Sequence, residues 1–403
     1  MSHPLPAVRE HHFVALLMAV QFVNAVDFMM VMPLAPDFAA ALGFSASQIG
    51  MLTGTFSIAS AIAGFIAALF LDHYSRKRAL LFCLGGMSLV TLLAVFAQDL
   101  HSMMAVRALT GLISGPIFGI CGAFVADVIP AHRRGAAMGQ LLGAFSVAVV
   151  LGVPFVLELA HWVDWRAPFI AVGLAGLIVL AAGLKYLPYH KPEAEHQPVA
   201  ARIASIGRML ASPLILASYG CSAIAMMAGF LLIPNIAAFI QMNMGYPRDD
   251  LAFLYLVGGA ITFFNQRWAG KLVDRTSATL VSILYGIIFI TNVYQGFVLQ
   301  AVAVPAAVTF VLFMVGMTGR GVAAQTLASK VPPPTWRGAY MVVQGAVINI
   351  ATSIAAYVSA QVLTEENGRL MNMEQLGWGA IILSLSVPLL FWYTERKIGS
   401  KPH

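Results

Sequence analysis

Four ionisable residues interrupt long apolar stretches of this sequence: Asp27, Arg107, Arg267 and Arg320. A charged side chain at the centre of a bilayer costs at least roughly 2.5–3.5 kcal/mol on insertion scales, so its presence there indicates a partner or a function. A carboxyl group in a dry site tends to hold a proton, while water or a nearby arginine favours its release. The pattern therefore predicts a proton-coupling site inside a membrane.

Asp27 and Arg107 are expected at a similar depth below the same membrane face. Asp27 precedes Pro36 by nine residues, and Arg107 follows His101 by six residues. At 1.5 Å rise per residue these helical segments measure about 14 Å and about 9 Å. We expect Asp27 to be the proton-coupling carboxylate, paired with Arg107 directly or through water. The alternative is a static structural ion pair.

Further polar residues in apolar stretches are candidates for a substrate cavity. Gln21, Asn24 and Asp27 recur at every third position, which keeps them on one face of a helix. Arg320 aligns with an apolar residue in the internal repeat described below, so we expect it to contact substrate. A snorkelling or packing arginine is the alternative there, and snorkelling is favoured for Arg267. The other cavity candidates are Gln325, Gln344, Asn349, Tyr219 and Asn235.

The composition shows which surface the chain presents. Of its 403 residues, 60% are hydrophobic and 10% are charged. A soluble globular protein carries about 45–50% apolar and about 25% charged residues, so this chain cannot cover itself with a water-facing surface. This excludes a soluble enzyme, a disordered chain and a nucleic-acid binder. The chain is expected to be a polytopic protein of the lipid bilayer.

Twelve apolar runs reach the roughly 20 residues that a helix needs to cross the hydrocarbon core. We expect an all-α protein with a six-helix bundle at 1–188 (the N-half), a cytoplasmic linker at 189–211 and a second six-helix bundle at 212–403 (the C-half). The expected spans lie near 13–35, 48–71, 79–97, 102–128, 136–159, 167–187, 213–240, 251–272, 278–299, 304–329, 339–363 and 376–394.

Most of the 23 Lys and Arg residues fall in connections on the same side as the two termini. Because positively charged loops stay in the cytoplasm, we expect both termini there, in a multi-pass protein of a bacterial inner membrane. The net charge of +6 then reflects topology. The three cysteines lie far apart in apolar runs, so we expect buried small side chains and no metal site.

The connection after the fourth span is repeated after the tenth. Residues 127–138 align with residues 330–341, and six of the aligned pairs are identical. Asp72, after the second span, aligns with Asp274 after the eighth at nearly the same offset. Parallel six-span repeats around a midplane site are the architecture of one large class of transporters. The repeat therefore indicates duplication of a six-span unit.

The segment ALFLDHYSRKR at 68–78 resembles a motif of the major facilitator superfamily, Gly-x-x-x-Asp-Arg-x-Gly-Arg-Arg/Lys. Asp72, Arg76 and Lys77 match this motif. The departures are Ala68, His73 and Ser75. The resemblance, which covers essentially the whole chain, implies two six-helix bundles that rock by alternating access around a central site.

The same resemblance implies a conformational latch at the cytoplasmic side. Asp72 would meet the positive N-terminal end of a helix in the other bundle near Arg337, and Arg76 would pair with Asp127. Such a network holds the outward-open state. The further members of the latch would be Lys77, Arg134 and Asp274. The alternative is a solvated turn that obeys the positive-inside rule.

Other stretches resemble the twelve-span drug:proton antiporters and the related sugar-efflux-like permeases. Arg107 opens an Arg-x-x-x-Gly sequence like their proton-coupling motif. Gly143, Gly152 and Pro154 match the spacing of their antiporter motif in the fifth span, although later glycines of that motif are missing. Small residues permit close helix contact, and the proline bends the helix as a hinge. Segments 27–36 and 165–169 also resemble these permeases.

The sequence contains no phosphate-binding loop and no metal-ligand or nucleophile motif, so we expect a transporter that is no enzyme and uses no cofactor beyond the proton gradient. Three membrane arginines against one aspartate favour an anionic, zwitterionic or neutral amphipathic solute over a cationic drug. We expect monomeric proton-coupled efflux, with protons, a small molecule and lipid as partners. The alternatives are a symporter or facilitator for uptake, and a transport-dead sensor or membrane-embedded enzyme.

Overall fold

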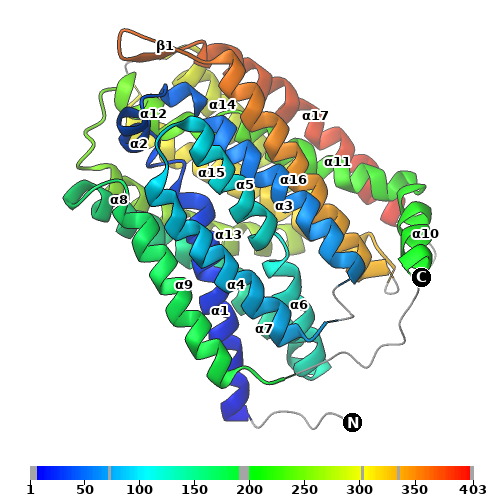
Figure 1. Ribbon diagram of the computed structural model, residues 1–403. Coiled ribbons are helices and arrows are strands. Elements are labelled where there is room, and N and C mark those ends of the chain that lie inside the picture. Colours follow the sequence, from blue (N-terminus) through cyan, green and yellow to red (C-terminus); the bar gives the residue numbers. More distant parts are fainter. Residues whose placement is uncertain (1–6, 71–73, 190–198, 301–303, 334–335, 400–403) are drawn as a thin grey trace.

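The computed structural model describes residues 7–70, 74–189, 199–300, 304–333 and 336–399, which form a long bundle of helices (Figure 1). The β1–β2 hairpin lies at one end of the bundle, which we call the hairpin end. The chain termini lie toward the other, the termini end (Figure 1).

The helices of the N-half and the linker are α1 (Ala7–Met30), α2 (Ala35–Leu42), η1 (Ala46–Gln48), α3 (Ile49–Phe70), α4 (Arg76–Leu93), η3 (Ala94–Phe96), α5 (Leu100–Ser114), α6 (Ile117–Val128), α7 (Ala131–Val147), η4 (Ala148–Gly152), α8 (Val153–Trp162), α9 (Ala167–Tyr186) and α10 (Val199–Leu210). The C-half contains α11 (Pro213–Phe230), α12 (Ile233–Met242), α13 (Leu251–Arg275), α14 (Ala278–Val293), η5 (Tyr294–Val298), α15 (Ala306–Lys330), α16 (Arg337–Val362), the strands β1 (Thr364–Glu366) and β2 (Arg369–Met371), and α17 (Met373–Gly399).

Eleven stretches of the described chain are long and apolar enough to cross a membrane as helices. They correspond to eleven of the twelve expected spans. The remaining span is α13, a continuous helix of 25 residues that lacks the required hydropathy. Its second half begins with the polar run Asn265, Gln266 and Arg267, which lowers the mean hydropathy of this helix. α13 packs against α15 and α14 of its own half and against α8 and η4 of the other (Figure 1).

Several spans break or end at positions where proline removes a backbone donor. The fourth span changes from α5 to α6 at Gly115 and Pro116. The first span ends in a turn that contains Pro33, between α1 and α2. The seventh span divides into α11 and α12, and Pro234 lies in the first turn of α12. These breaks let one span present two helix directions to its neighbours.

The halves are joined most closely toward the hairpin end, where α3 packs along α16. Gly50 faces the backbone of Ala356 so closely that a Cβ atom there would overlap with its carbonyl oxygen. Ser353 donates a hydrogen bond of 2.8 Å to the carbonyl oxygen of Gly54. Glycines thus allow these two helices to approach at the first half of α3 and the second half of α16.

A short antiparallel hairpin, β1–β2, was not foreseen in the all-α expectation. Asn367 and Gly368 form its tip, with φ angles of 50° and 71°. Asn-Gly is the pair that a two-residue hairpin turn favours, because both central residues need positive φ. This dipeptide in the sequence was the signal for the hairpin.

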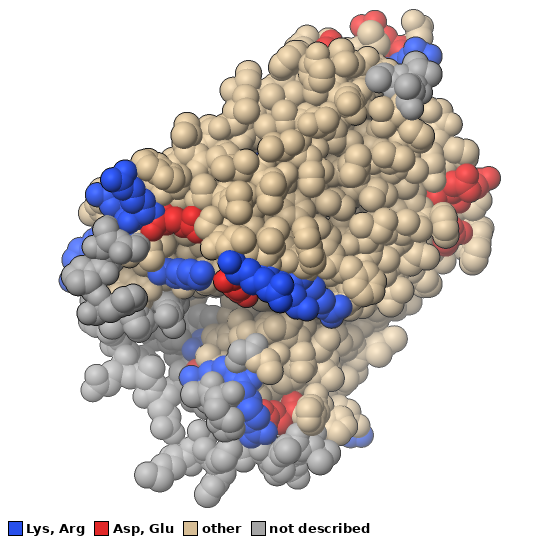
Figure 2. Space-filling model, turned by 180° about the vertical axis from the view of Figure 1, so that it is seen from behind, with Lys and Arg blue, Asp and Glu red and all other residues tan. Residues whose placement is uncertain are grey.

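The termini end is hollowed, and Lys and Arg side chains gather around the hollow (Figure 2). The linker helix α10 lies at this end and packs on α3, α11 and α16. Lys77 donates hydrogen bonds of 2.8 Å to the carbonyl oxygens of Leu184 and Leu187, which satisfies the last turn of α9.

Gly319 of α15 tests how strongly close packing within the C-half stabilises the fold. A Cβ atom at Gly319 would overlap with the ring of Tyr285 in α14, whereas Gly286 has no such neighbour within 4 Å. We expect Gly319→Ala to destabilise the protein by about 1–3 kcal/mol, the usual cost of overpacking. A thermal-unfolding measurement in detergent should show a lower transition temperature for this variant and a nearly unchanged one for Gly286→Ala. Equal transitions for both variants would refute this account of the packing.

Candidate functional site

The structure joins Asp27 of α1 to Arg107 of α5 in a buried ion pair. Arg107 Nη1 lies 3.0 Å from Asp27 Oδ2, and the two side chains are 2% and 0% exposed. A third residue, Thr91 of α4, lies 2.7 Å from Asp27 Oδ1 through its hydroxyl. The carboxylate therefore receives a donor at each oxygen, from two different helices. Sequence reasoning gave the first two residues and missed Thr91.

Tight packing of α3 on α5 holds Arg107 in place. The guanidinium lies 4.5 Å from the centroid of the Phe56 ring, a favourable cation–π contact. Gly111 allows this approach, because a Cβ atom there would lie 2.5 Å from the carbonyl oxygen of Phe56. Ser60 also donates to the carbonyl oxygen of Gly111, at 3.2 Å. The glycine of the Arg-x-x-x-Gly motif thus sets the distance between the two helices.

A capping box at Asp99 fixes the start of α5 and so the register of Arg107. The backbone N–H of Ser102 donates to Asp99 Oδ1 at 2.8 Å, and the Ser102 hydroxyl accepts from the backbone of Asp99. Hydrogen bonds from the backbone and side chain of Ser102 lower the pKa of the Asp99 carboxyl.

The π-helical turn η4 packs against α1 beside Asp27. A Cβ atom at Gly152 would overlap with Val26, the residue before Asp27. On its other side η4 meets α13, where a Cβ atom at Gly259 would lie 3.1 Å from Val150 Cα. Pro154 follows in the first turn of α8, while Gly143 has open space around it. The predicted hinge thus contains a π-helical turn that contacts both α1, the helix of Asp27, and the C-half.

A second polar cluster lies in the C-half and unites two of the predicted cavity residues. Gln344 of α16 donates to the Ser222 hydroxyl of α11 at 3.0 Å and approaches Gln325 Oε1 of α15 at 3.5 Å. Gln325 is exposed, whereas Gln344 is buried. A shallow pocket opens here. Its lining residues are Ser222, Ala225, Met226, Gly321, Ala324, Gln325 and Ile348.

Arg320 lies behind this pocket, with its side chain buried. Its guanidinium donates to the Ser384 hydroxyl at 3.0 Å and to the carbonyl oxygen of Ala225 at 3.2 Å. It also stacks on the Phe289 ring at 4.4 Å. No carboxylate within the described residues forms an ion pair with it. Arg320 therefore places an uncompensated positive charge behind a wall that includes Ala225.

The other predicted cavity residues are distributed differently. Tyr219 stacks on Tyr340 at 4.8 Å and is buried beneath α10, so it forms part of a packed cluster. Asn235 is buried and donates to the Ser359 hydroxyl at 3.0 Å. Gln21 is buried, and its side-chain oxygen has no hydrogen-bond partner in the described part of the chain. Asn24 and Asn349 are half-buried.

At the termini end, one contact of the predicted latch is formed within the N-half. Arg76 Nε lies 2.9 Å from Asp127 Oδ2. Arg134 donates to the carbonyl oxygen of Ile129 at 2.8 Å, and Asp274 is exposed near the end of α13. Asp72 and the side chain of Arg337 lie outside the described residues.

Arg267, the remaining charged residue predicted inside a span, lies in α13. It is exposed, and its guanidinium lies over the Phe263 ring at 3.8 Å.

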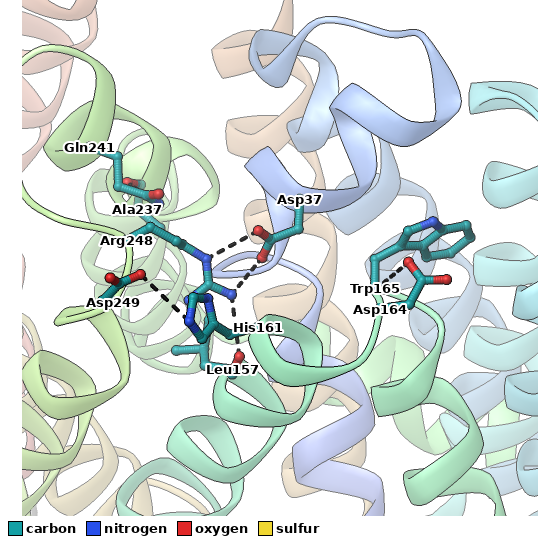
Figure 3. Close-up of polar contacts among 9 residues, drawn as sticks. All are labelled: Asp37, Leu157, His161, Asp164, Trp165, Ala237, Gln241, Arg248 and Asp249. Carbon is teal, nitrogen blue, oxygen red and sulfur yellow. Dashed lines mark hydrogen bonds and ion pairs between the residues drawn. The ribbon is translucent and has the colours of Figure 1, made fainter.

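At the hairpin end, Arg248 connects the two halves, a role that sequence reasoning missed. Its guanidinium makes a two-point contact with Asp37 of α2, at 3.1 and 2.8 Å, and donates to the carbonyl oxygen of Leu157 in α8 at 3.2 Å (Figure 3). His161 and Asp249 lie 3.6 Å apart in the same region (Figure 3). The only sequence signal was a basic residue in an outer loop, where the positive-inside rule disfavours one.

The hairpin provides a further contact across the same end. Glu365 of β1 accepts hydrogen bonds from the Ser45 hydroxyl at 2.8 Å and from the backbone N–H of Ala46 at 3.1 Å. A carboxylate at the N-terminal end of η1 satisfies backbone donors that have no partner in the helix. Two separate carboxylate contacts, at Asp37 and Glu365, therefore hold the halves together at the hairpin end.

Comparison with known proteins identifies relatives along the whole chain. Residues 17–356 match the family model of the Major Facilitator Superfamily. The inner membrane transport protein YdhP of Escherichia coli (strain K12) is 25% identical over 376 residues, which cover 91% of this chain and 92% of that protein. A chloramphenicol resistance protein of Streptomyces lividans is 24% identical over 392 residues, 95% of each chain.

Solved structures share the fold at low sequence identity. A bacterial homolog of the human lysosomal transporter Spinster, inward-facing and unoccupied, superimposes with a TM-score of 0.79 at 14% identity and covers 99% of this chain and 100% of its own. A D-xylose-proton symporter gives a TM-score of 0.75 at 16% identity, over 96% and 98% of the chains.

Arg248→Gln tests the role of the hairpin-end contact. The substitution removes the two-point ion pair with Asp37, so we expect the halves to separate at this end in a larger fraction of molecules. Spin labels can be attached at Trp162→Cys and Glu366→Cys, two exposed positions in opposite halves. Double electron–electron resonance should then show a new population with a longer distance between the two labels. Arg166→Gln is the control, because Arg166 pairs with Asp164 within one half. An unchanged distance distribution in Arg248→Gln would contradict the role of the ion pair.

Proposed function

The chain belongs to the Major Facilitator Superfamily, and we propose that it is a proton-coupled secondary transporter of the inner membrane. In this proposal it exports a small amphipathic, zwitterionic or anionic solute by alternating access. The buried ion pair of Asp27 and Arg107 is the observation that carries the proposal. A carboxylate enclosed by a guanidinium and a hydroxyl inside a membrane is a group that a proton can neutralise in place.

Proton uptake would change the balance of charge in the N-half. With Asp27 ionised, the pair carries no net charge and each carboxylate oxygen has a donor. When a proton binds Asp27, Arg107 keeps its positive charge and loses its counter-charge, because an arginine remains protonated. The pair then becomes less stable in a dry environment. We propose that this destabilisation drives the chain toward a conformation in which water reaches Arg107.

The C-half cluster supplies the proposed substrate contacts. The amide of Gln325 and the hydroxyl of Ser222 can donate and accept hydrogen bonds at the pocket. Met226 and Ile348 offer an apolar wall beside them. The uncompensated charge of Arg320 behind this wall favours a solute with negative or polar groups over a cation. A neutral amphipathic solute such as chloramphenicol, for which one relative is named, satisfies the same chemistry.

We infer from the contacts between the halves at which end of the bundle the cavity opens. The ion pair of Asp37 with Arg248 and the bonds to Glu365 close the hairpin end. The hollow lies at the termini end, among the basic side chains (Figure 2). With both termini in the cytoplasm, as the positive-inside rule predicts, this arrangement is inward-facing. We propose that the network around Arg76 and Asp127 belongs to the latch that forms when this end closes.

Asp27→Asn tests the coupling role with chloramphenicol as the probe. We expect the purified protein in liposomes to accumulate the drug on the acidic side of an imposed pH gradient, because protons leave that side as the drug enters it. Because an asparagine side chain cannot bind a proton at this site, gradient-driven accumulation in the variant should fall to that of protein-free liposomes, while exchange between equal drug pools persists. Asp164→Asn, an exposed loop carboxylate, should transport like the wild type.

Two results would decide against this proposal. Accumulation of the drug on the side toward which protons flow, so that drug and protons move in the same direction, would indicate symport, the alternative mode of uptake. Unchanged gradient-driven transport in Asp27→Asn would leave the ion pair as a structural feature only. If chloramphenicol is not moved, a panel of anionic and zwitterionic solutes under the same gradient decides whether any solute is exchanged for protons.

A further inference from the structure

Thr91 differs from many other hydroxyl groups of this chain in the acceptor of its hydrogen bond. A serine or threonine inside a helix commonly donates to the carbonyl oxygen four residues earlier. Thr91 instead lies 2.7 Å from Asp27 Oδ1 on a neighbouring helix, and its side chain is buried. The residues that show the common arrangement include Ser88, Thr110, Thr276, Thr318, Thr326, Ser384 and Thr394.

A hydroxyl group can do at Asp27 what Arg107 cannot. An arginine only donates hydrogen bonds, so it is matched to the ionised carboxylate. A threonine hydroxyl donates to the carboxylate when Asp27 is ionised and can accept from it when Asp27 is protonated. In the second case the Thr91 hydrogen turns away from the carboxyl group. Thr91 can therefore form a hydrogen bond with Asp27 in both protonation states.

We propose that Thr91 is a positioning residue that sets the proton affinity of Asp27, an inference that rests on the proton-coupling role proposed above. The incoming proton binds Asp27 Oδ1, the new O–H donates to Thr91 Oγ1, and the Thr91 hydrogen turns away from the carboxyl group. Oδ2 remains an acceptor for Arg107. Both carboxyl oxygens of Asp27 therefore keep a partner when the proton is taken up.

The direction of the effect follows from the strength of the two hydrogen bonds. A bond to an ionised group is roughly twice as strong as one between neutral groups, so Thr91 stabilises ionised Asp27 more than protonated Asp27. Removal of the hydroxyl should therefore favour the protonated form. We expect Thr91→Val to move the midpoint of Asp27 titration upward by about one pH unit, a tenfold change in proton affinity.

Arg107 is the charged residue that contacts Asp27. No hydrogen bond or ion pair in the described chain joins Asp27 to other titratable groups on the elements packed against α1 or on α5. Those groups are Arg76, Lys77, Arg78, Cys83, His101, Cys121, Asp127, Arg133, Arg134, Glu158, His161, Lys185 and Tyr186. Any titration shift in Thr91→Val is therefore assigned through this three-residue site.

Infrared titration of the purified protein measures this without any substrate. The C=O band of a protonated carboxyl group that disappears in Asp27→Asn is assigned to Asp27, and its intensity is followed against pH. Thr91→Val should shift the midpoint upward, while Thr91→Ser, which keeps the hydroxyl, should restore the wild-type value. Thr110→Val is the matched control, because the buried Thr110 hydroxyl donates to Val106 within its own helix. Its midpoint should not move.

The outcomes separate this inference from the proposed function. An unshifted midpoint in Thr91→Val, or the same shift in Thr110→Val, overturns the role of Thr91 even if Asp27→Asn abolishes coupled transport. A shifted midpoint with rescue by Thr91→Ser upholds the role of Thr91 even if transport turns out not to be coupled to protons. Should Thr91→Val fail to fold, Thr91→Ala and Thr91→Cys against Thr91→Ser make the same comparison.

Discussion

The buried ion pair of Asp27 and Arg107 is the interaction on which the rest of this structure depends. Two opposite charges in a dry environment are stable together and costly apart, because neither can be solvated alone. The N-half is arranged to meet this constraint. Gly111 brings α3 close enough for Phe56 to cover the guanidinium, and Thr91 supplies the second donor to the carboxylate. Binding of one proton at Asp27 would therefore alter the stability of the packed region formed by α1, α3, α4 and α5.

The proposed proton site and the proposed substrate pocket lie in different halves of the chain. Asp27 is enclosed by residues of the N-half, whereas Ser222, Gln325 and Gln344 belong to the C-half. Direct competition between proton and solute at one carboxylate is therefore not required by the geometry. The π-helical turn η4 offers a physical connection, since it touches α1 at Val26 and α13 near Gly259. A movement of α1 on protonation would therefore be transmitted through η4 to the contact between the halves.

Closure of the hairpin end relies on contacts of a different kind. Glycines let α3 and α16 approach until backbone meets backbone, and two carboxylates bind groups of the opposite half. The ion pair of Arg248 with Asp37 is partly exposed, so water can replace each partner when the halves separate. This makes it suited to reversible closure, whereas the buried pair at Asp27 would be suited to the proton-dependent change proposed above.

Much of this protein could be predicted from its sequence because a bilayer leaves few choices. Twenty-residue apolar runs must become helices, and a charge inside them must find a partner, so the spans, the repeat and the pairing of Asp27 with Arg107 followed from spacing and depth. The sequence could not give Thr91, Arg248 or Glu365, because a lone hydroxyl or loop charge has no periodic signal. Their partners lie on other helices, and only the packing of those helices decided that Thr91 would face Asp27, that Arg320 would be enclosed without a carboxylate, and that the chain would close at the hairpin end.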